Sequence, residues 1–193
     1  FLSRVGKEIL VKAVAQAIPI YAMSFFDITK SFCDEISSMV CRYWWNNQDE
    51  ERHHWLSWQC LTKPKTEGGL GLRDLHIFNL AMLARQGWRL LQDPESLCGR
   101  VLRAKYFPDG KLLDVVPPPG ISYTWRSILK GVDLLKEGII WRVGDGTNIK
   151  VWEDPWIPEG DTRRPRSLPR RSPTTLVADL VNPNTGGWDE GMV

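Results

Sequence analysis

The residues that could carry metal or acid–base chemistry are few, and their spacing matches no established site. His53, His54 and Cys60 come closest to a metal-ligand set, but their separation does not fit the ligand spacing of zinc sites. Asp145 stands between two glycines, where an aspartate usually makes a turn, although a role as metal ligand or catalytic acid is the alternative. The sequence therefore predicts no metal site and no cofactor, and it predicts that the isolated chain is not an enzyme.

The composition is that of a globular protein with a locally basic surface. The 193 residues are 42% hydrophobic and 25% charged, which suits one domain or slightly more, with a substantial core. The net charge is only +2, but between residues 52 and 105 nine Lys and Arg residues stand against four acids. Such a local excess matters more than the total charge for attracting a polyanion.

The cysteines and the hydropathy predict an intracellular setting. The cysteines form no CxxC pair, and Cys33 and Cys41 lie eight residues apart in a predicted helix, too far along its axis to bridge. We therefore expect reduced, buried thiols. No run of about 18 apolar residues is present, so no membrane span is predicted. Without a signal peptide or an initiator methionine, we expect a fragment of a longer protein of the nucleus, the cytoplasm or both.

The most informative stretch runs from Trp55 to Leu91. It opens with Trp55 and Trp58, which could stack on unpaired bases or pack into the core. A Lys-Pro-Lys turn and the cluster Gly68-Gly69-Leu70-Gly71 follow. The cluster lacks the ending of a phosphate-binding loop. It predicts either a tight turn that lets leucines pack or, with the amides of the next helix, an anion site.

A long helix follows the glycine cluster, capped by Asp74 or Asn79. Its apolar stripe recurs at helical spacing and consists of Leu80, Leu83, Ala84, Gly87, Trp88 and Leu91. Arg85 and Arg89 lie one turn apart on another face. Such a pair is either a solvated surface or a ridge that faces phosphates.

These residues carry a family resemblance. The segment PKTEGGLGLRDLHIFNLAMLARQGWRLL closely resembles the pattern PKxxGGLGxRDLxxFNxALLAKQxWRLL of plant LINE-type (non-LTR) retrotransposon reverse transcriptases. The likeness extends upstream to LSRVGKEILVKAVAQAIPIYAMSFFDITKSFCDEI, and downstream to SLCGRVLRAKYFP and SYTWRSILKGVDLLKEGIIWRVGDGTNIKVWEDPWIP. It covers Phe1 to about Pro158 and corresponds to the region between the polymerase core and the ribonuclease H/zinc-binding end.

The resemblance implies a division of labour along the chain. Residues 1–47 would be a thumb-like helical hairpin, residues 48–158 a connection region, and residues 159–193 a flexible basic linker and stub. The thumb of a reverse transcriptase holds the template–primer duplex in its minor groove. The YxDD carboxylates that would hold Mg²⁺ are absent from this sequence, as is a ribonuclease H carboxylate set. Any Mg²⁺ would therefore belong to the missing polymerase core.

The pattern as a whole predicts a mainly α fold: a thumb-like helical bundle, a small β-hairpin near residues 139–152 and an irregular C-terminal tail. Helices besides the central one are expected at about 3–18, 29–47, 95–106 and 122–138. The first should start at Ser3 and point inward with Val5, Ile9, Leu10, Ala13, Val14 and Ala17. The second should do so with Phe32, Ile36, Met39, Val40, Tyr43 and Trp44.

Two functions of different class follow from these features. The first is a non-catalytic piece that positions template–primer or element RNA, with RNA or an RNA–DNA hybrid and the missing polymerase and ribonuclease H domains as partners and no membrane. Its candidate nucleic-acid contacts are Lys7, Lys12, Lys63, Lys65, Arg73, Arg85, Arg89, Arg100 and Arg103. The second is an interdomain scaffold with no nucleic-acid affinity. A continuous basic stripe would favour the first function, and scattered cations the second.

Overall fold

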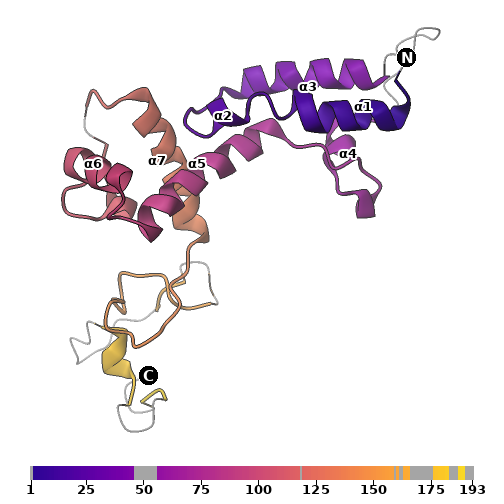
Figure 1. Cartoon of the computed structure of the whole chain (residues 1–193). Helices are drawn as coiled ribbons and strands as arrows, with labels where there is room; N and C mark the ends of the chain where they lie inside the picture. Colours follow the sequence, from indigo (N-terminus) through magenta and orange to yellow (C-terminus); the bar gives the residue numbers. More distant parts are fainter. Residues whose placement is uncertain are drawn as a thin grey trace. The chain divides into compact units, whose positions relative to one another are not determined.

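The computed structural model describes residues 2–45, 56–117, 119–158, 160, 163–165, 176–182 and 187–189. The chain divides into two compact units, Phe1–Glu137 and Gly138–Val193 (Figure 1). The described part is mostly helical, as predicted. The sequence predicts three regions that meet near residues 47 and 158. Both meeting points lie in or beside residues outside the described ranges, so the three-region division stays a prediction.

The N-terminal helices begin as their capping residues predict. α1 (Arg4–Leu10) starts at Ser3, whose hydroxyl accepts a hydrogen bond from the Gly6 amide, and it continues as the π-helical turn η1 (Val11–Ala15). After Pro19 the chain forms the short α2 (Ile20–Met23). α3 (Lys30–Trp45) then returns alongside α1 (Figure 1).

The predicted inward face is wrong for the first helix and partly right for α3. On α1 and η1, the buried residues are Val11 and, just beyond, Gln16. All six residues predicted to point inward are exposed or half-buried: Val5, Ile9, Leu10, Ala13, Val14 and Ala17. On α3, Val40 is buried and Ile36, Tyr43 and Trp44 pack against the core, as predicted. Cys33, Ser37 and Cys41 are buried as well, whereas Phe32 and Met39, also predicted to point inward, are exposed. The contact between α1 and α3, and not the width of the apolar arc alone, decides which side of the first helix is buried.

The glycine cluster makes a tight turn. α4 (Trp58–Thr62) begins at Ser57, whose hydroxyl accepts a hydrogen bond from the Cys60 amide. The 3₁₀ turn η2 (Lys65–Glu67) follows and ends at Gly68, which has a positive φ of 80°. The amides of Gly69, Leu70, Gly71 and Leu72 all donate to carbonyls of residues 61–64. Those amides are thus already used, so the turn interpretation holds and the anion-site interpretation of the cluster does not.

Two buried amide side chains hold the N-terminal helices against the segment that leads into α5 (Leu75–Gln92). Gln16, 2% exposed, donates to the carbonyl oxygen of Arg73 and accepts from its amide. Asn79, 0% exposed, donates to the carbonyls of Met23 and Phe26 and accepts from the Ile28 amide. Asp74 caps α5, so the alternative of Asn79 as the cap is wrong.

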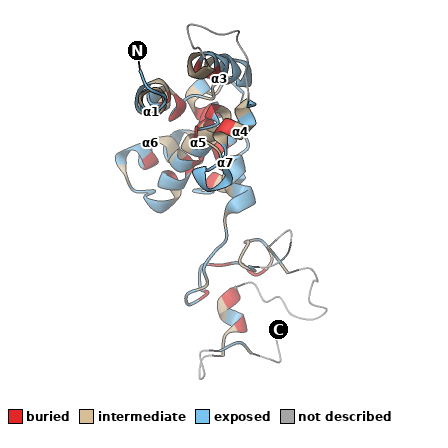
Figure 2. Cartoon of the chain, turned by 90° about the vertical axis from the view of Figure 1, so that its right-hand side faces the viewer, coloured by how far each residue is buried: buried red, intermediate tan, exposed pale blue. Residues whose placement is uncertain are grey.

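α5 crosses α7 (Tyr123–Gly138) at glycines. A Cβ on Gly131 would lie 2.3 Å from the Ala84 nitrogen, and one on Gly87 would lie 2.9 Å from a Val132 methyl. The helices can approach this closely only because both positions lack a side chain. Figure 2 shows buried residues gathered where the helices of this unit meet.

α6 (Leu97–Tyr106) packs beside this crossing. The core here contains Leu90, Phe107, Leu112, Trp125, Ile128 and Val132. The Trp125 ring stacks nearly parallel on Tyr106 and Phe107, at centroid distances of 4.7 and 5.7 Å. Leu97 and Val101 are exposed, because Leu102 and the small Gly99 occupy the packed side of α6.

The second unit does not contain the predicted β-hairpin. Among its described residues the backbone pairing is limited to isolated bridges, such as Lys150 with Leu176. Gly146 has a φ of 73°, and its carbonyl accepts a hydrogen bond from the Ala178 amide. The segment after residue 176 therefore lies where the first strand of the predicted hairpin was expected. Its small core holds Ile149, Val151, Val177 and Leu180.

The rest of this unit contains a predicted turn and part of a predicted basic linker. Asp145 makes the predicted turn by accepting from the Thr147 amide, which lowers the pKa of its carboxyl. Of the basic linker, Arg166, Arg170 and Arg171 lie outside the described residues, whereas Arg163 donates to the Ile139 carbonyl.

Two further features concern the whole described chain. No helix in the described ranges has the length and apolar character needed to cross a bilayer. Cys33 and Cys41 are buried, as expected, but Cys60 is half-buried and Cys98 is exposed. Burial raises the pKa of the Cys33 and Cys41 thiols.

Replacing Asn79 with alanine should destabilise the first unit by about 3 kcal/mol, because two carbonyls and one amide would lose their buried partner. Urea unfolding followed by circular dichroism measures this. Arg85→Ala, on the exposed face of the same helix, is the matched control and should change stability by less than about 0.5 kcal/mol. Equal effects of the two variants would contradict the assigned role of Asn79.

Gly131→Ala should cost about 2 kcal/mol, because its Cβ would press on the backbone of α5 and separate the crossing helices. Gly138→Ala, at the end of the same helix with open space around it, is the control and should be close to neutral. The shift in melting temperature measures both. A neutral Gly131→Ala variant would show that α5 and α7 do not cross at this point.

Candidate nucleic-acid interface

Three predicted contact residues gather around the glycine turn. Lys12 of η1 and Lys65 of η2 both reach Glu8 of α1, with Nζ to Oε1 distances of 2.8 and 2.7 Å. The hydrogen bonds from Lys12 and then Lys65 lower the pKa of Glu8 from 4.5 to about 2. Two lysines share one carboxylate, so the group keeps a positive charge, and the exposed Lys63 adds to it.

Lys7 and Arg73 lie on aromatic rings instead. The Lys7 ammonium is 5.6 Å from the centre of the Tyr43 ring, and the Arg73 guanidinium is 4.8 Å from that of Phe78. A cation over a ring face is attracted by the ring quadrupole and keeps its charge. The Lys7 ammonium also donates to the Trp44 carbonyl at 3.5 Å, so packing and hydrogen bonding partly order these side chains.

The exposed cations of α5 and α6 form a second group. Arg85 and Arg89 project from the exposed face of α5, and Arg89 donates to Gln86 at 3.5 Å. On α6, Arg100 is exposed, while Arg103 lies 3.7 Å from Glu95. No ion pair occurs at Arg85, Arg89 or Arg100 within the described part of the chain.

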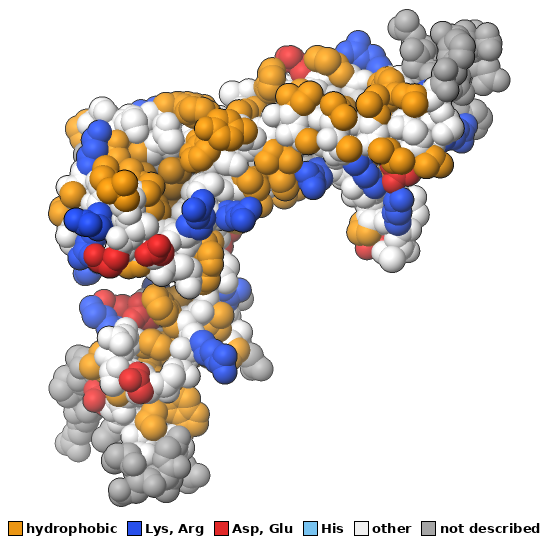
Figure 3. All heavy atoms as spheres, in the orientation of Figure 1, with side chains coloured by type: hydrophobic (Ala, Val, Ile, Leu, Met, Phe, Trp, Pro, Cys, Tyr) orange, Lys and Arg blue, Asp and Glu red, His pale blue; other side chains and the backbone are white. Residues whose placement is uncertain are grey.

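On the face of the first unit drawn in Figure 3, the Lys and Arg side chains do not form one continuous band, because hydrophobic and uncharged side chains lie between them. The glycine-turn group contains Lys12, Lys63 and Lys65, and the arginine group contains Arg85, Arg89, Arg100 and Arg103. The predicted role of these residues in binding nucleic acid stays a prediction, with two local sites in place of a continuous stripe.

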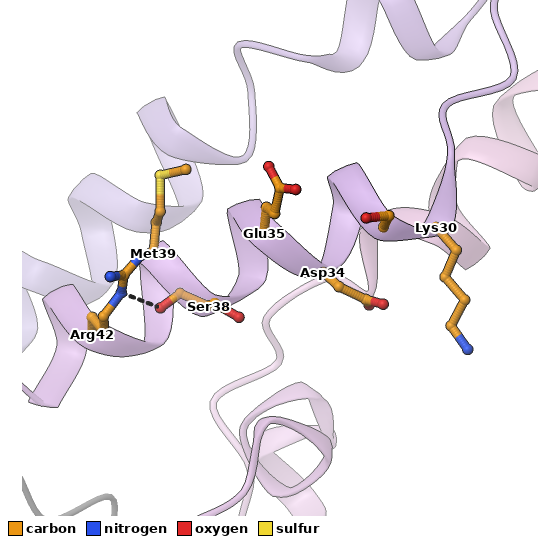
Figure 4. A pocket seen from close by; sticks show the side chains of 7 residues that line it. Lys30, Asp34, Glu35, Ser38, Met39 and Arg42 are labelled. Carbon is orange, nitrogen blue, oxygen red and sulfur yellow. Dashed lines mark hydrogen bonds between the residues drawn. The ribbon is translucent and has the colours of Figure 1, made fainter.

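A shallow groove along α3 offers charged side chains but no convergent site. It is lined by Lys30, Asp34, Glu35, Ser38, Met39 and Arg42, all from one helix. Figure 4 shows these side chains fanning out in different directions, with Arg42 bonded to the Ser38 carbonyl. Within the described residues no group of three His, Cys, Asp or Glu side chains could hold a metal ion.

The structure also contains a second pocket, which the sequence did not predict. It lies between the end of α2, the C-terminal half of α5, the start of α6 and the start of α7, and Arg89 is on its wall. Its residues come from segments as far apart as Phe25 and Ile128, so no local pattern could have indicated it.

Comparison with known proteins gives relatives but no named domain. No protein-family model matches the chain, and no solved structure does. The chain is similar to the uncharacterized mitochondrial protein AtMg00310 of Arabidopsis thaliana, with 42% identity over 143 residues, which cover 73% of this chain and 93% of that protein. The chain belongs to the family of this mitochondrial protein.

A longer relative is a putative ribonuclease H protein, At1g65750, also of Arabidopsis thaliana. The two share 35% identity over 198 aligned positions, which cover 97% of this chain and 31% of that protein. The chain therefore spans about a third of the length of this relative.

Glu8→Gln should lower the melting temperature at neutral pH, because the two lysines lose their shared carboxylate. The folded-state pKa of Glu8 is depressed, so its contribution is complete above about pH 4.5 and is lost as pH falls toward about 2. The difference in melting temperature between wild type and variant should shrink over that window.

Glu67→Gln, an exposed acid on the same turn, is the control and should show no such pH dependence. A difference for Glu8→Gln that stays constant from pH 7 to pH 3 would contradict the ionic contact.

Proposed function

We propose that the chain is a non-catalytic piece of a retroelement-derived polyprotein that grips a template–primer duplex or the element's RNA. The similarity to a putative ribonuclease H protein supports this origin. A ribonuclease H cuts the RNA strand of an RNA–DNA hybrid, so a segment of such a protein would work beside that hybrid. An A-form or hybrid duplex is recognised by its shape and by contacts to phosphate and 2′-OH groups, which a few well-placed cations can provide.

The observation that carries the proposal is the set of arginines without a carboxylate partner on α5 and α6. Arg85, Arg89 and Arg100 are exposed, and no ion pair in the described residues neutralises them. Unpaired guanidinium groups bind phosphate in a bidentate manner and release condensed counterions when they do so. The glycine-turn lysines would make a second contact.

The finer assignment follows the family resemblance. The chain would be the thumb and connection region of a LINE-type reverse transcriptase. Catalysis and Mg²⁺ would belong to a polymerase core outside this chain. Its partners would be RNA or an RNA–DNA hybrid together with the polymerase and ribonuclease H domains of the parent protein, and its setting the nucleus, the cytoplasm or both.

A scaffold role is the second candidate, and one observation favours it. Four apolar side chains of the N-terminal segment, Val5, Ile9, Ile18 and Tyr21, are each between 61% and 80% exposed. Apolar side chains that gather in an exposed patch usually mark a contact with another protein surface. A scaffold would use such side chains against a neighbouring domain and would have no affinity for nucleic acid.

Binding of a fluorescent RNA–DNA hybrid across a salt series separates the two functions. If the six cations Lys63, Lys65, Arg73, Arg85, Arg89 and Arg103 contact phosphates, log K should fall against log salt with a slope of roughly −5. Replacing Arg85, Arg89 and Arg103 with alanine should flatten the slope to roughly −3. Fluorescence anisotropy measures both slopes.

Alanine at Lys30, Arg42 and Lys111, three exposed cations outside the candidate set, is the matched control for net charge. Its slope should stay near that of the wild type. A folded chain that does not bind the hybrid at about 50 mM salt would rule out the grip and leave the scaffold.

A further inference from the structure

The hollow beside Arg89 has the features of a small ligand pocket. Its volume is about 460 Å³, and it is lined from four elements by residues that include Phe25, Gln86, Arg89, Leu102, Thr124 and Ile128. Ligand pockets in proteins commonly measure about 300–1,000 Å³ and combine apolar walls with a few polar groups. Here Phe25, Leu102 and Ile128 are the apolar part, and Gln86, Arg89 and Thr124 the polar part.

The aromatic wall is held in place by contacts outside the pocket. Asn79 fixes the carbonyls of Met23 and Phe26 on either side of Phe25. The hydroxyl of Tyr123 donates to the Asp27 carbonyl at 2.6 Å, and the Phe26 and Tyr123 rings stack at 6.0 Å. Lys130 forms an ion pair with Asp27. The segment that carries Phe25 is therefore anchored to both α5 and α7 before any ligand arrives.

The chemistry of the lining matches an unstacked nucleobase with its phosphate. A base presents a flat π-face to an aromatic ring, and its edge carries hydrogen-bond donors and acceptors that a Gln amide or a Thr hydroxyl can match. Arg89 adds a positive charge at the wall, on the same helix face as Arg85. Asp93, also in the lining, can accept from an exocyclic amino group.

We propose that this pocket takes one splayed base of a single-stranded RNA or DNA segment, with Arg89 against the adjoining phosphate. The inference rests on the proposed nucleic-acid function and adds to it a single-strand site that shares Arg89 with the duplex contact. A base that is still stacked in a duplex cannot enter the pocket, so the two sites read different forms of nucleic acid.

The test compares a labelled single-stranded RNA octamer with an RNA–DNA hybrid in fluorescence anisotropy at fixed low salt. Phe25→Ala removes the stacking wall and should weaken octamer binding about tenfold, in line with roughly 1–3 kcal/mol per stacked base. Hybrid binding should stay within about twofold. Phe32→Ala, an exposed phenylalanine on α3 outside the pocket, is the matched control and should change neither affinity.

A second variant guards against a folding effect. Thr124→Trp fills the pocket, whereas Thr124→Ala leaves it open, and melting curves check that each variant is folded. Loss of octamer binding with tryptophan but not with alanine supports the proposal. Octamer binding that neither Phe25→Ala nor Thr124→Trp weakens overturns it while leaving the duplex grip intact. A wild-type chain that binds neither nucleic acid overturns both proposals.

Discussion

The fold of the first unit depends on one buried carboxamide. Asn79 is fully enclosed and satisfies three backbone groups of the segment between α2 and α3, which otherwise would be buried without partners. Gln16 makes an equivalent pair of bonds to Arg73 one layer away. Side chains thus supply hydrogen bonds that helices cannot supply to one another, because a helix has already paired its own backbone. These two residues therefore fix the positions of three segments: the N-terminal helices, the start of α5 and the segment that carries Phe25.

The electrostatic arrangement follows from that scaffold. Because Gln16 and Arg73 bring the end of η1 next to the glycine turn, Lys12 and Lys65 arrive on the same carboxylate although 53 positions separate them in the sequence. On α5 and α6, by contrast, Arg85, Arg89 and Arg100 have no ion pair among the described residues, whereas Arg103 lies 3.7 Å from Glu95. A polyanion would therefore meet the partly neutralised lysines and these three arginines with different strength.

The sequence predicted helices well where a single signal dominated. Ser3, Asp74, Ser96 and Ser122 have the capping chemistry that starts a helix, and the apolar spacing of α5 and α7 has one clear period. The predictions were wrong where the local sequence was equally compatible with two structures. Val5 and Ile9 are as apolar as Val11, so the buried side of α1 was decided by tertiary contact with α3. The alternation around Asp145 suits a hairpin, yet residues 149 and 150 pair with a segment about 26 positions later, a choice no local pattern contains. The pocket beside Arg89 and Phe25 could not be predicted for the same reason.

Because the chain forms a π-helical turn at Val11–Ala15, the number of residues in this segment matters for the fold as much as their types do. Such a turn holds one residue more than an α-helical turn over the same stretch, and each residue of a helix rotates the chain by about 100°. A chain one residue shorter here would rotate α1 by about 100° relative to the segment that follows it, and so would turn a different face of α1 to α3. In an alignment of relatives, a single gap at this position would therefore separate chains with different surfaces even where their aligned residues are identical.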